Sequence, residues 1–370
     1  MSEDVEKFSG ILAMHDAPCA KVIDREWVAD AIVKIEADAQ RSSDTHLFQL
    51  PLKNLEGIEI YLKDESTHLT GSLKHRLARS LILYGICNGK VGRNSTLVEA
   101  SSGSTAVSEA YFAQLLKLEF VAVVPRGTSD QKLDAIRRYG GQIREVDAHL
   151  IYAEANRLAK EKNGYYLDQF TNAERATDWR SNNNIAESLF QQMENERHSV
   201  PSWIVVGAGT GGTAATIGRY IRFKAKQFEQ TRLCVADPEN SVFFEGFQTG
   251  REDVKREPKS RIEGVGRPRV EPSFLPTVID RMIKIKDEAS MATSHWLAET
   301  TGRYFGPSTG LNVYCTLALA REMQQRGDEG SLVCLGCDDG HRYRNTCFDA
   351  EWLKQNKLEV APFLSELRSF

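Results

Sequence analysis

The stretch WIVVGAGTGGT (203–213) joins an apolar run to a loop of glycine and threonine residues. A short run rich in isoleucine and valine is typical of a buried parallel strand. The loop ends where a helical pattern begins, and we expect that helix from about Thr213 to Phe228. A strand, a glycine-rich loop and a helix in this order predict a protein of the α/β class.

Other parts of the chain repeat this order of elements. An alternating stretch from Ile58 to Lys63 predicts a strand, and a helical pattern follows from Ser72. Because helical segments lie between most of the remaining apolar runs, we expect mostly parallel sheets with flanking helices. Those runs are TLVEA (96–100), FVAVV (120–124), QIREV (142–146), RLCVA (232–236) and SLVCL (331–335).

The composition is that of a globular protein. The 370 residues are 41% hydrophobic and carry a formal net charge of −4, which does not favour binding to nucleic acid or to an anionic membrane. No run approaches the roughly 18 apolar residues of a membrane span. The acidic N-terminus lacks the apolar core of a secretory signal. Seven cysteines, an odd number, suit a reducing cytoplasm better than a disulfide framework.

Four short loops gather glycine, serine and threonine where a helix is expected to begin. The first turn of a helix presents unpaired backbone N–H groups and a partial positive charge, so helix capping alone accounts for any one such loop. Four of them in one α/β chain predict a small anionic ligand held by neutral donors. The loops are LTGSLK (69–74), ASSGST (100–105), GAGTGGT (207–213) and GPSTG (306–310).

The loop at 207–213 leaves two kinds of ligand open. Gly207, Gly209 and Gly212 fit the G-x-G-x-x-G fingerprint of dinucleotide-binding proteins, so an NAD(P)-dependent oxidoreductase is one alternative. Thr210 and Thr213 add hydroxyl groups that suit a terminal phosphate monoester. A nucleotide-binding P-loop is excluded because Thr213 stands where that motif requires lysine.

Lys74 is unusual because a cation in the first turn of a helix opposes the helix dipole by about 0.3–1 kcal/mol. Such a side chain either points into solvent or takes part in chemistry. Positive surroundings lower the pKa of an ammonium group and favour the neutral amine that forms imines. Lys74 is therefore a candidate nucleophile.

The stretch LKDESTHLTGSLKHR (62–76) resembles the lysine motif of the cysteine synthase and cystathionine β-synthase family. The likeness runs from about residue 45 to 350. It implies an enzyme that uses pyridoxal 5′-phosphate (PLP) on a small amino acid, with the two-domain α/β fold type II of the tryptophan synthase β subunit, as a homodimer. Other family segments are resembled by EASSGSTA (99–106, substrate carboxylate), GTGGT (209–213, phosphate), GPSTG (306–310) and DGHRYRNT (339–346, the C-terminal segment).

The resemblance gives each loop a role and implies no metal. Lys74 holds PLP covalently and then moves the α-proton, Ser308 faces the pyridine nitrogen, and Gln169 reaches the substrate carboxylate. Ser104 stands where the family has an asparagine that contacts the cofactor's 3′-hydroxyl. The PLP phosphate is assigned to Gly209, Thr210, Gly211, Gly212 and Thr213. The substrate carboxylate is assigned to Ser101, Ser102, Gly103 and Thr105.

Three departures from the synthase pattern bear on the reaction. Ser104 is shorter than asparagine, His75 replaces an aspartate, and DQFTNAERATDWR (168–180) lacks the usual P-A-N. Together with ASSGST they resemble the branch of L-cysteine desulfhydrases, which implies β-elimination of L-cysteine to hydrogen sulfide, pyruvate and ammonia. The alternative is β-replacement of the cysteine synthase or cystathionine β-synthase type, from O-acetylserine, O-phosphoserine or serine.

The family pattern also predicts domain limits. We expect an N-terminal extension over 1–45, a large PLP-binding domain over 46–79 and 169–355, a small mobile domain over 80–168, and a C-terminal tail over 356–370. The charged stretch 251–270 is expected to be an exposed loop. Cys334 and Cys337 have C-L-G-C spacing and are interpreted as core cysteines, with redox regulation and zinc binding left open.

Overall fold

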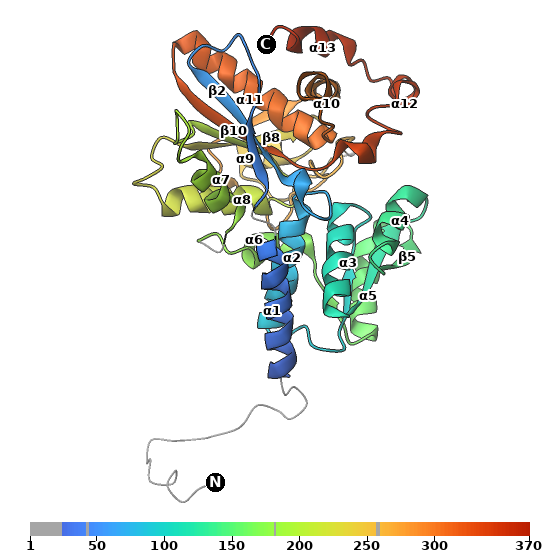
Figure 1. Ribbon diagram of the computed structural model, residues 1–370. Coiled ribbons are helices and arrows are strands. Elements are labelled where there is room, and N and C mark those ends of the chain that lie inside the picture. Colours follow the sequence, from blue (N-terminus) through green and yellow to red (C-terminus); the bar gives the residue numbers. More distant parts are fainter. Residues whose placement is uncertain (1–23, 42–43, 181–182, 257–259) are drawn as a thin grey trace, which may run out of the picture.

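The computed structural model of the protein describes residues 24–41, 44–180, 183–256 and 260–370 (Figure 1). Most of the predicted N-terminal extension therefore lies outside the described residues. The strands are β1 (His46–Gln49), β2 (Ile58–Asp64), β3 (Thr96–Glu99), β4 (Glu119–Pro125), β5 (Gln142–Val146), β6 (Tyr165–Tyr166), β7 (Trp203–Gly207), β8 (Arg232–Pro238), β9 (Arg281–Ile285) and β10 (Gly330–Gly336).

The helices lie mainly between the strands, as the sequence predicts. They are α1 (Arg25–Arg41), α2 (Lys74–Cys87), α3 (Ser104–Leu116), α4 (Asp130–Arg137), α5 (Ile151–Glu161), α6 (Gln169–Ala176), α7 (Ile185–Met193), α8 (Gly212–Phe223), α9 (Phe243–Thr249), α10 (Asp287–Thr301), α11 (Pro307–Arg326), α12 (Ala350–Gln355) and α13 (Ala361–Leu367). Helix α8 ends at Phe223, so the prediction of a helix continuing to Phe228 is wrong over its last turn.

The strands form two sheets. The larger sheet has six strands in the order β1-β2-β10-β7-β8-β9, and every neighbouring pair is parallel except β1 with β2 at one edge. The smaller sheet has four parallel strands in the order β5-β4-β3-β6. The prediction of an α/β fold with mainly parallel sheets is confirmed.

Helices cover both faces of the larger sheet because its strands are apolar on both sides. In β7, Val205 packs with α10 and α11 on one face, whereas Ile204 and Val206 pack with α7 and α8 on the other. Successive residues of a strand point to opposite faces, so one apolar run supplies both cores. Figure 1 shows this sheet between the two helix layers.

The smaller sheet is covered in the same way. In β4, Phe120, Ala122 and Val124 belong to a core that includes residues of α1, α2, α3 and α4, whereas Val121 and Val123 pack against α5. Asp24 directly precedes helix α1, and its Oδ1 accepts a hydrogen bond from the Trp27 N–H at 2.9 Å. The helix lies beside α2 and α3 in Figure 1.

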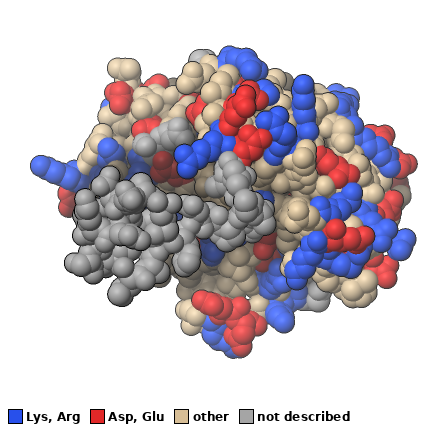
Figure 2. Space-filling view, turned by 90° about the horizontal axis from the view of Figure 1, so that it is seen from below, with Lys and Arg blue, Asp and Glu red and all other residues tan. Residues whose placement is uncertain are grey.

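Three loops follow parallel strands at their carboxyl ends. Residues 100–103 follow β3, residues 208–211 follow β7, and residues 337–339 follow β10. Ligands of open α/β sheets bind at such strand ends. Within the described residues, no helix has both the length and the apolar character needed to cross a membrane. Figure 2 shows Lys and Arg interspersed with Asp and Glu on the face seen from below.

Candidate active site

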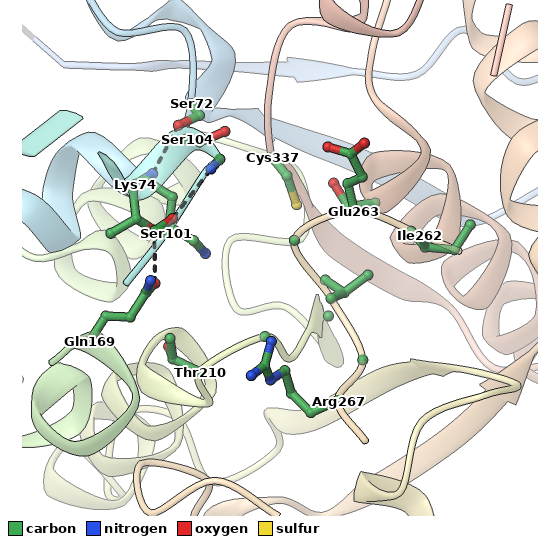
Figure 3. Close-up of a pocket in the computed structure, with 18 of the residues that line it drawn as sticks. Ser72, Lys74, Ser101, Ser104, Gln169, Thr210, Ile262, Glu263, Arg267 and Cys337 are labelled. Carbon is green, nitrogen blue, oxygen red and sulfur yellow. Dashed lines mark hydrogen bonds between the residues drawn. The ribbon is translucent and has the colours of Figure 1, made fainter. Parts of the chain in front are cut away.

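A cavity of about 440 Å³ lies where the loops of the two sheets meet (Figure 3). It brings together all four glycine-, serine- and threonine-rich loops that the sequence singles out. Of the predicted site residues, the cavity is lined by Lys74, Ser101, Ser102, Gly103, Ser104, Thr105, Gln169, Gly209, Thr210, Gly211, Thr213 and Ser308. Gly212 is set back from the cavity as the first residue of α8.

Lys74 is held at the start of α2 by contacts to the segment after β10. The Leu73 N–H donates to the Cys337 carbonyl oxygen at 2.9 Å, and Ser72 forms an isolated β-bridge with Asp338. Burial lowers the pKa of the Lys74 amine, an effect that the Asp338 carboxylate partly opposes. No hydrogen bond or ion pair to the amine is found in the described part of the chain, so this amine faces the cavity with reduced proton affinity.

The glycine-rich loop before α8 is packed directly against other backbone. A Cβ atom added at Gly209 would lie 2.1 Å from the carbonyl oxygen of Gly264. Gly211 has φ +92°, and a Cβ there would lie 2.5 Å from the carbonyl oxygen of Ser273. Only glycine fits these positions. The loop therefore brings the backbone N–H groups at the start of α8 to the cavity, where they suit an anion such as a phosphate.

The loop 100–105 is held by side-chain hydrogen bonds instead. Thr105 Oγ1 donates to Gln169 Oε1 at 2.8 Å, and Arg342 Nη1 donates to Ser104 Oγ at 2.7 Å. Gly103 precedes α3 without a side-chain cap, and the space around its Cα is open. The N-terminus of α3 is thus available to an anion in the cavity.

Ser308 is buried in the first turn of α11. Cys337 lines the same cavity, and its thiol accepts a hydrogen bond from Asn312 Nδ2 at 3.3 Å. Burial raises the pKa of the Cys337 thiol to about 12, so the thiol stays protonated at neutral pH. Ser308 is therefore a neutral donor or acceptor with a neutral neighbour.

The structure separates the two cysteines of the C-L-G-C sequence. Cys334 is fully buried in the core beneath the larger sheet, as predicted, whereas Cys337 lines the cavity and is a site residue that the sequence interpretation missed. Among the described residues, the six cysteines are free thiols and no group of ligating side chains could hold a metal ion. The signal for Cys337 is its place two residues before the D-G-x-R-Y segment at 339–343.

The prediction of an exposed loop over 251–270 is wrong for the part that reaches the cavity. Residues 262–268 line it, and Ile262 and Val265 are buried. Arg267 donates from Nη2 to the Tyr152 hydroxyl at 2.7 Å and stacks over the Phe170 ring at 4.1 Å. The apolar residues of this segment lie between charged residues and form no periodic pattern. The sequence analysis therefore did not identify residues 262–268 as part of the cavity lining.

His75, which follows the lysine, points away from the cavity. Its Nδ1 is 3.1 Å from Thr70 Oγ1, and its ring packs between Tyr111 and Phe112. Burial lowers the pKa of His75. This departure from the family pattern therefore changes the packing of α2 against α3 rather than the lining of the cavity.

Comparison with known families identifies the cofactor of the family to which the chain belongs. A family model described as pyridoxal-phosphate dependent enzyme matches residues 40–338, most of the chain. The chain belongs to this family. The resemblance seen in the sequence is thus confirmed, and the cofactor of the family is PLP. The matched segment includes both Lys74 and the glycine-rich loop, so this loop serves a PLP enzyme and the nicotinamide-dependent alternative is set aside.

The residues present fit this cofactor on structural grounds. Lys74 offers an amine without a competing partner among the described residues, the loop 209–213 offers the backbone N–H groups at the start of α8, and Ser308 offers a neutral hydroxyl. An aldehyde, a phosphate monoester and a ring nitrogen require these three kinds of group.

Individual relatives agree with the family. The chain is 56% identical over 355 residues to the L-cysteine desulfhydrase Cds1 of Mycobacterium tuberculosis, covering 94% of this chain and 96% of that protein. It is 27% identical over 326 residues to a cysteine synthase of Dictyostelium discoideum, covering 84% and 83%. The crystal structure of O-ureido-L-serine synthase superposes with a TM-score of 0.73 at 26% identity, covering 83% of this chain and 92% of that one. The predicted fold type II is confirmed.

Proposed function

We propose that the protein is a PLP-dependent lyase that converts L-cysteine and water into hydrogen sulfide, pyruvate and ammonia. The observation that carries the proposal is the 56% identity, over almost the whole of both chains, to an L-cysteine desulfhydrase. The cavity supports it by presenting groups for a phosphate, a carboxylate and a proton transfer within one space.

Lys74 is the residue that we assign to catalysis. Bound PLP supplies an electron sink for the charge left at Cα when the α-proton departs. The Lys74 Nζ atom accepts that proton, and burial favours the neutral amine by lowering its pKa. The bond from Cβ to sulfur then breaks with its electron pair on sulfur, which takes up a proton and leaves as hydrogen sulfide.

Ser308 directs this chemistry toward elimination. Its neutral hydroxyl stabilises a positive charge on a ring nitrogen less than a carboxylate would. The negative charge left at Cα is therefore withdrawn less completely into the cofactor ring. Loss of a β-leaving group then competes well with return of the proton to Cα. Cys337 does not change this balance, because its thiol remains protonated.

The substrate carboxylate is assigned to the N-terminus of α3. Ser101, Ser102, Gly103 and Thr105 border the cavity there, and Gln169 is joined to Thr105 by a hydrogen bond. Backbone N–H groups and hydroxyls at a helix N-terminus bind a carboxylate without a full positive charge. The hydroxyl of Ser104 is engaged by Arg342, so its assigned contact to the cofactor remains part of the proposal.

A second candidate reaction is β-replacement, because a cysteine synthase and O-ureido-L-serine synthase are also similar to this chain. The two reactions share Lys74 and the carboxylate loop. They differ in whether water or an added nucleophile completes the reaction.

The assembly and location are also proposed. A homodimer rests on the family resemblance alone, and size-exclusion chromatography with light scattering tests it. A cytoplasmic location is supported by the free thiols of the described cysteines, which suit a reducing compartment. The predicted domain limits, with 80–168 as a small mobile unit, remain a proposal that limited proteolysis with and without substrate would test.

The deciding experiment gives the purified PLP-loaded protein L-cysteine and no other substrate. We expect sulfide and pyruvate in equal amounts, formed continuously. A parallel reaction with O-acetylserine and sulfide measures cysteine formation. If cysteine formation from O-acetylserine is fast and sulfide release from cysteine is absent, the elimination proposal is wrong and β-replacement takes its place.

A further inference from the structure

Two buried carboxyl groups lie directly behind the loop assigned to the substrate carboxylate. Glu99 is the last residue of β3 and is fully buried. Its Oε1 accepts from the Ala100 N–H at 2.8 Å, and its Oε2 accepts from the Gln169 N–H at 3.1 Å. Glu99 thus connects the first residue of the loop 100–105 to the first residue of α6.

These two segments form one side of the cavity. The loop carries Thr105 and the helix carries Gln169, and their side chains are joined across the cavity wall at 2.8 Å. Glu99 holds the same two segments together through their backbone. A displacement of its carboxylate would therefore move the loop and the helix relative to each other.

The second carboxyl group is that of Glu109, which is fully buried on α3. It lies within hydrogen-bonding reach of Glu99, and neither of its oxygen atoms has a donor among the described residues. Glu99 and Glu109 also form no ion pair with any described side chain. Two carboxylates in contact in a low-dielectric interior cannot both be ionised, so one proton between them is required.

The neighbouring groups in the described part of the chain do not supply a positive charge that could take the place of this shared proton. Asp168, which precedes α6, adds negative charge near Glu99, and the buried Tyr166 hydroxyl has no partner among the described residues. Burial raises the pKa of Glu99 to about 8, with the Gln169 and Ala100 N–H groups acting in the opposite direction. Burial and the charge of Glu99 raise the pKa of Glu109 well above its ordinary range.

We propose that Glu99 and Glu109 are a positioning pair for the substrate-carboxylate site, in which one shared proton allows Glu99 to hold the Ala100 and Gln169 backbone in place. Loss of this proton brings two negative charges together behind the loop and weakens binding of the substrate carboxylate. The chemistry at Lys74 is unaffected once substrate is bound. The inference rests on the proposed function only for the choice of L-cysteine as substrate.

The test replaces Glu109 by glutamine, whose amide donates to Glu99 at every pH. Binding of L-alanine, which has no β-leaving group, is measured by the change in cofactor absorbance of the PLP-loaded protein from about pH 7 to about pH 9. In the unsubstituted protein we expect the dissociation constant, and KM for L-cysteine, to rise roughly tenfold over this range, with little change in kcat. Glu109→Gln abolishes most of the rise.

Two further variants separate positioning from a general effect. Glu99→Gln keeps one acceptor oxygen but loses the other, so we expect weaker L-alanine binding at every pH. Glu119→Gln, on the neighbouring strand β4, removes a carboxylate that binds Thr96 and Lys162 away from the cavity, and the alkaline rise should persist. Ionisation of the ligand's own amino group affects all variants alike and cancels in the comparison.

A readout without cofactor covers the case in which a variant binds PLP poorly. A raised folded-state pKa contributes stability that is present below the unfolded pKa of about 4.5 and is lost as pH rises through about 8. Urea unfolding of the PLP-free protein should therefore show a free energy of unfolding that falls between about pH 5 and about pH 8, levels off at higher pH, and falls less in Glu109→Gln.

The outcomes are distinct. A pH dependence of L-alanine binding that is the same in Glu109→Gln and in the unsubstituted protein refutes the positioning pair. If Glu109→Gln does not fold, pH-independent unfolding of the unsubstituted protein refutes it equally. If L-cysteine yields no sulfide while L-alanine binding shows the expected pH dependence, the proposed function fails and the pair stands.

Discussion

Two loops form two walls of the cavity and are held in place by different means: the first wall is the loop before α8, and the second wall is the loop before α3. The glycine-rich loop before α8 is fixed by backbone packed on backbone, with Gly209 against Gly264 and Gly211 against Ser273. The loop before α3 is fixed by side chains: Ser104 to Arg342, Thr105 to Gln169. Backbone contact leaves no room for an added atom, whereas a hydrogen bond between side chains breaks and re-forms at small cost.

This contrast suits the two ligands that we assign to the walls. A resident cofactor benefits from a rigid site, because little ordering is needed when it binds. A substrate that enters and leaves in every turnover benefits from a wall that adjusts. We therefore expect substitutions in the first wall to change PLP affinity and substitutions in the second to change KM.

Replacing Lys74, which lies between the walls, should have the largest effect. We expect Lys74→Ala to lower sulfide formation at least about 10³-fold, because both the covalent attachment and the proton transfer are lost. Pyruvate release and the yellow colour of the protein are the measurements. Lys90→Ala, in the exposed segment after α2, is the control and should keep full activity. Normal turnover in Lys74→Ala would remove the basis of the mechanism.

The next effect compares one glycine from each wall. Gly209→Ala places a Cβ 2.1 Å from a carbonyl oxygen, and such overlap costs about 1–3 kcal/mol, so PLP affinity should fall roughly tenfold or more. Gly103→Ala meets no atom within 4 Å, and PLP affinity should be unchanged. Titration of the PLP-free protein, followed by absorbance, measures both. Equal losses would show that the walls do not differ as described.

The smallest expected effect comes from a substitution in the loop before α3, and it concerns substrate binding alone. Thr105→Val removes the hydroxyl that donates to Gln169 and leaves that amide oxygen unpaired, at a cost of about 1–3 kcal/mol. We expect KM for L-cysteine to rise roughly tenfold while PLP affinity and the absorbance spectrum stay constant. Thr301→Val serves as a matched control, since its hydroxyl donates to the Leu297 carbonyl oxygen within α10, and neither residue lines the cavity. A change in PLP affinity in Thr105→Val would contradict the separation of the walls.

Much of the fold follows from local patterns. The run WIVVG at 203–207 is β7 residue for residue, because a strand apolar on both faces cannot be mistaken for a surface segment. β9 was not predicted, because Arg281 and Lys284 interrupt its apolar residues. β6 has two residues and leaves no pattern at all.

The candidate site likewise contains residues that the sequence reveals and residues that it does not. Lys74 and the loop residues are recognisable because glycine and hydroxyl residues that gather at several helix starts indicate a site for an anion. Cys337, Arg267 and the Glu99–Glu109 pair were not recognised. Their significance depends on which chain segments meet in space, and a single sequence does not carry that information.

The free cysteines have a consequence for an enzyme of the proposed kind. Released sulfide is a nucleophile that cleaves disulfide bonds, as thiolates do. Among the described cysteines no such bond exists, and only Cys87 is exposed. We therefore expect the free energy of unfolding to stay constant while hydrogen sulfide accumulates. Hydrophobic packing and hydrogen bonds contain no bond that a reductant can cleave.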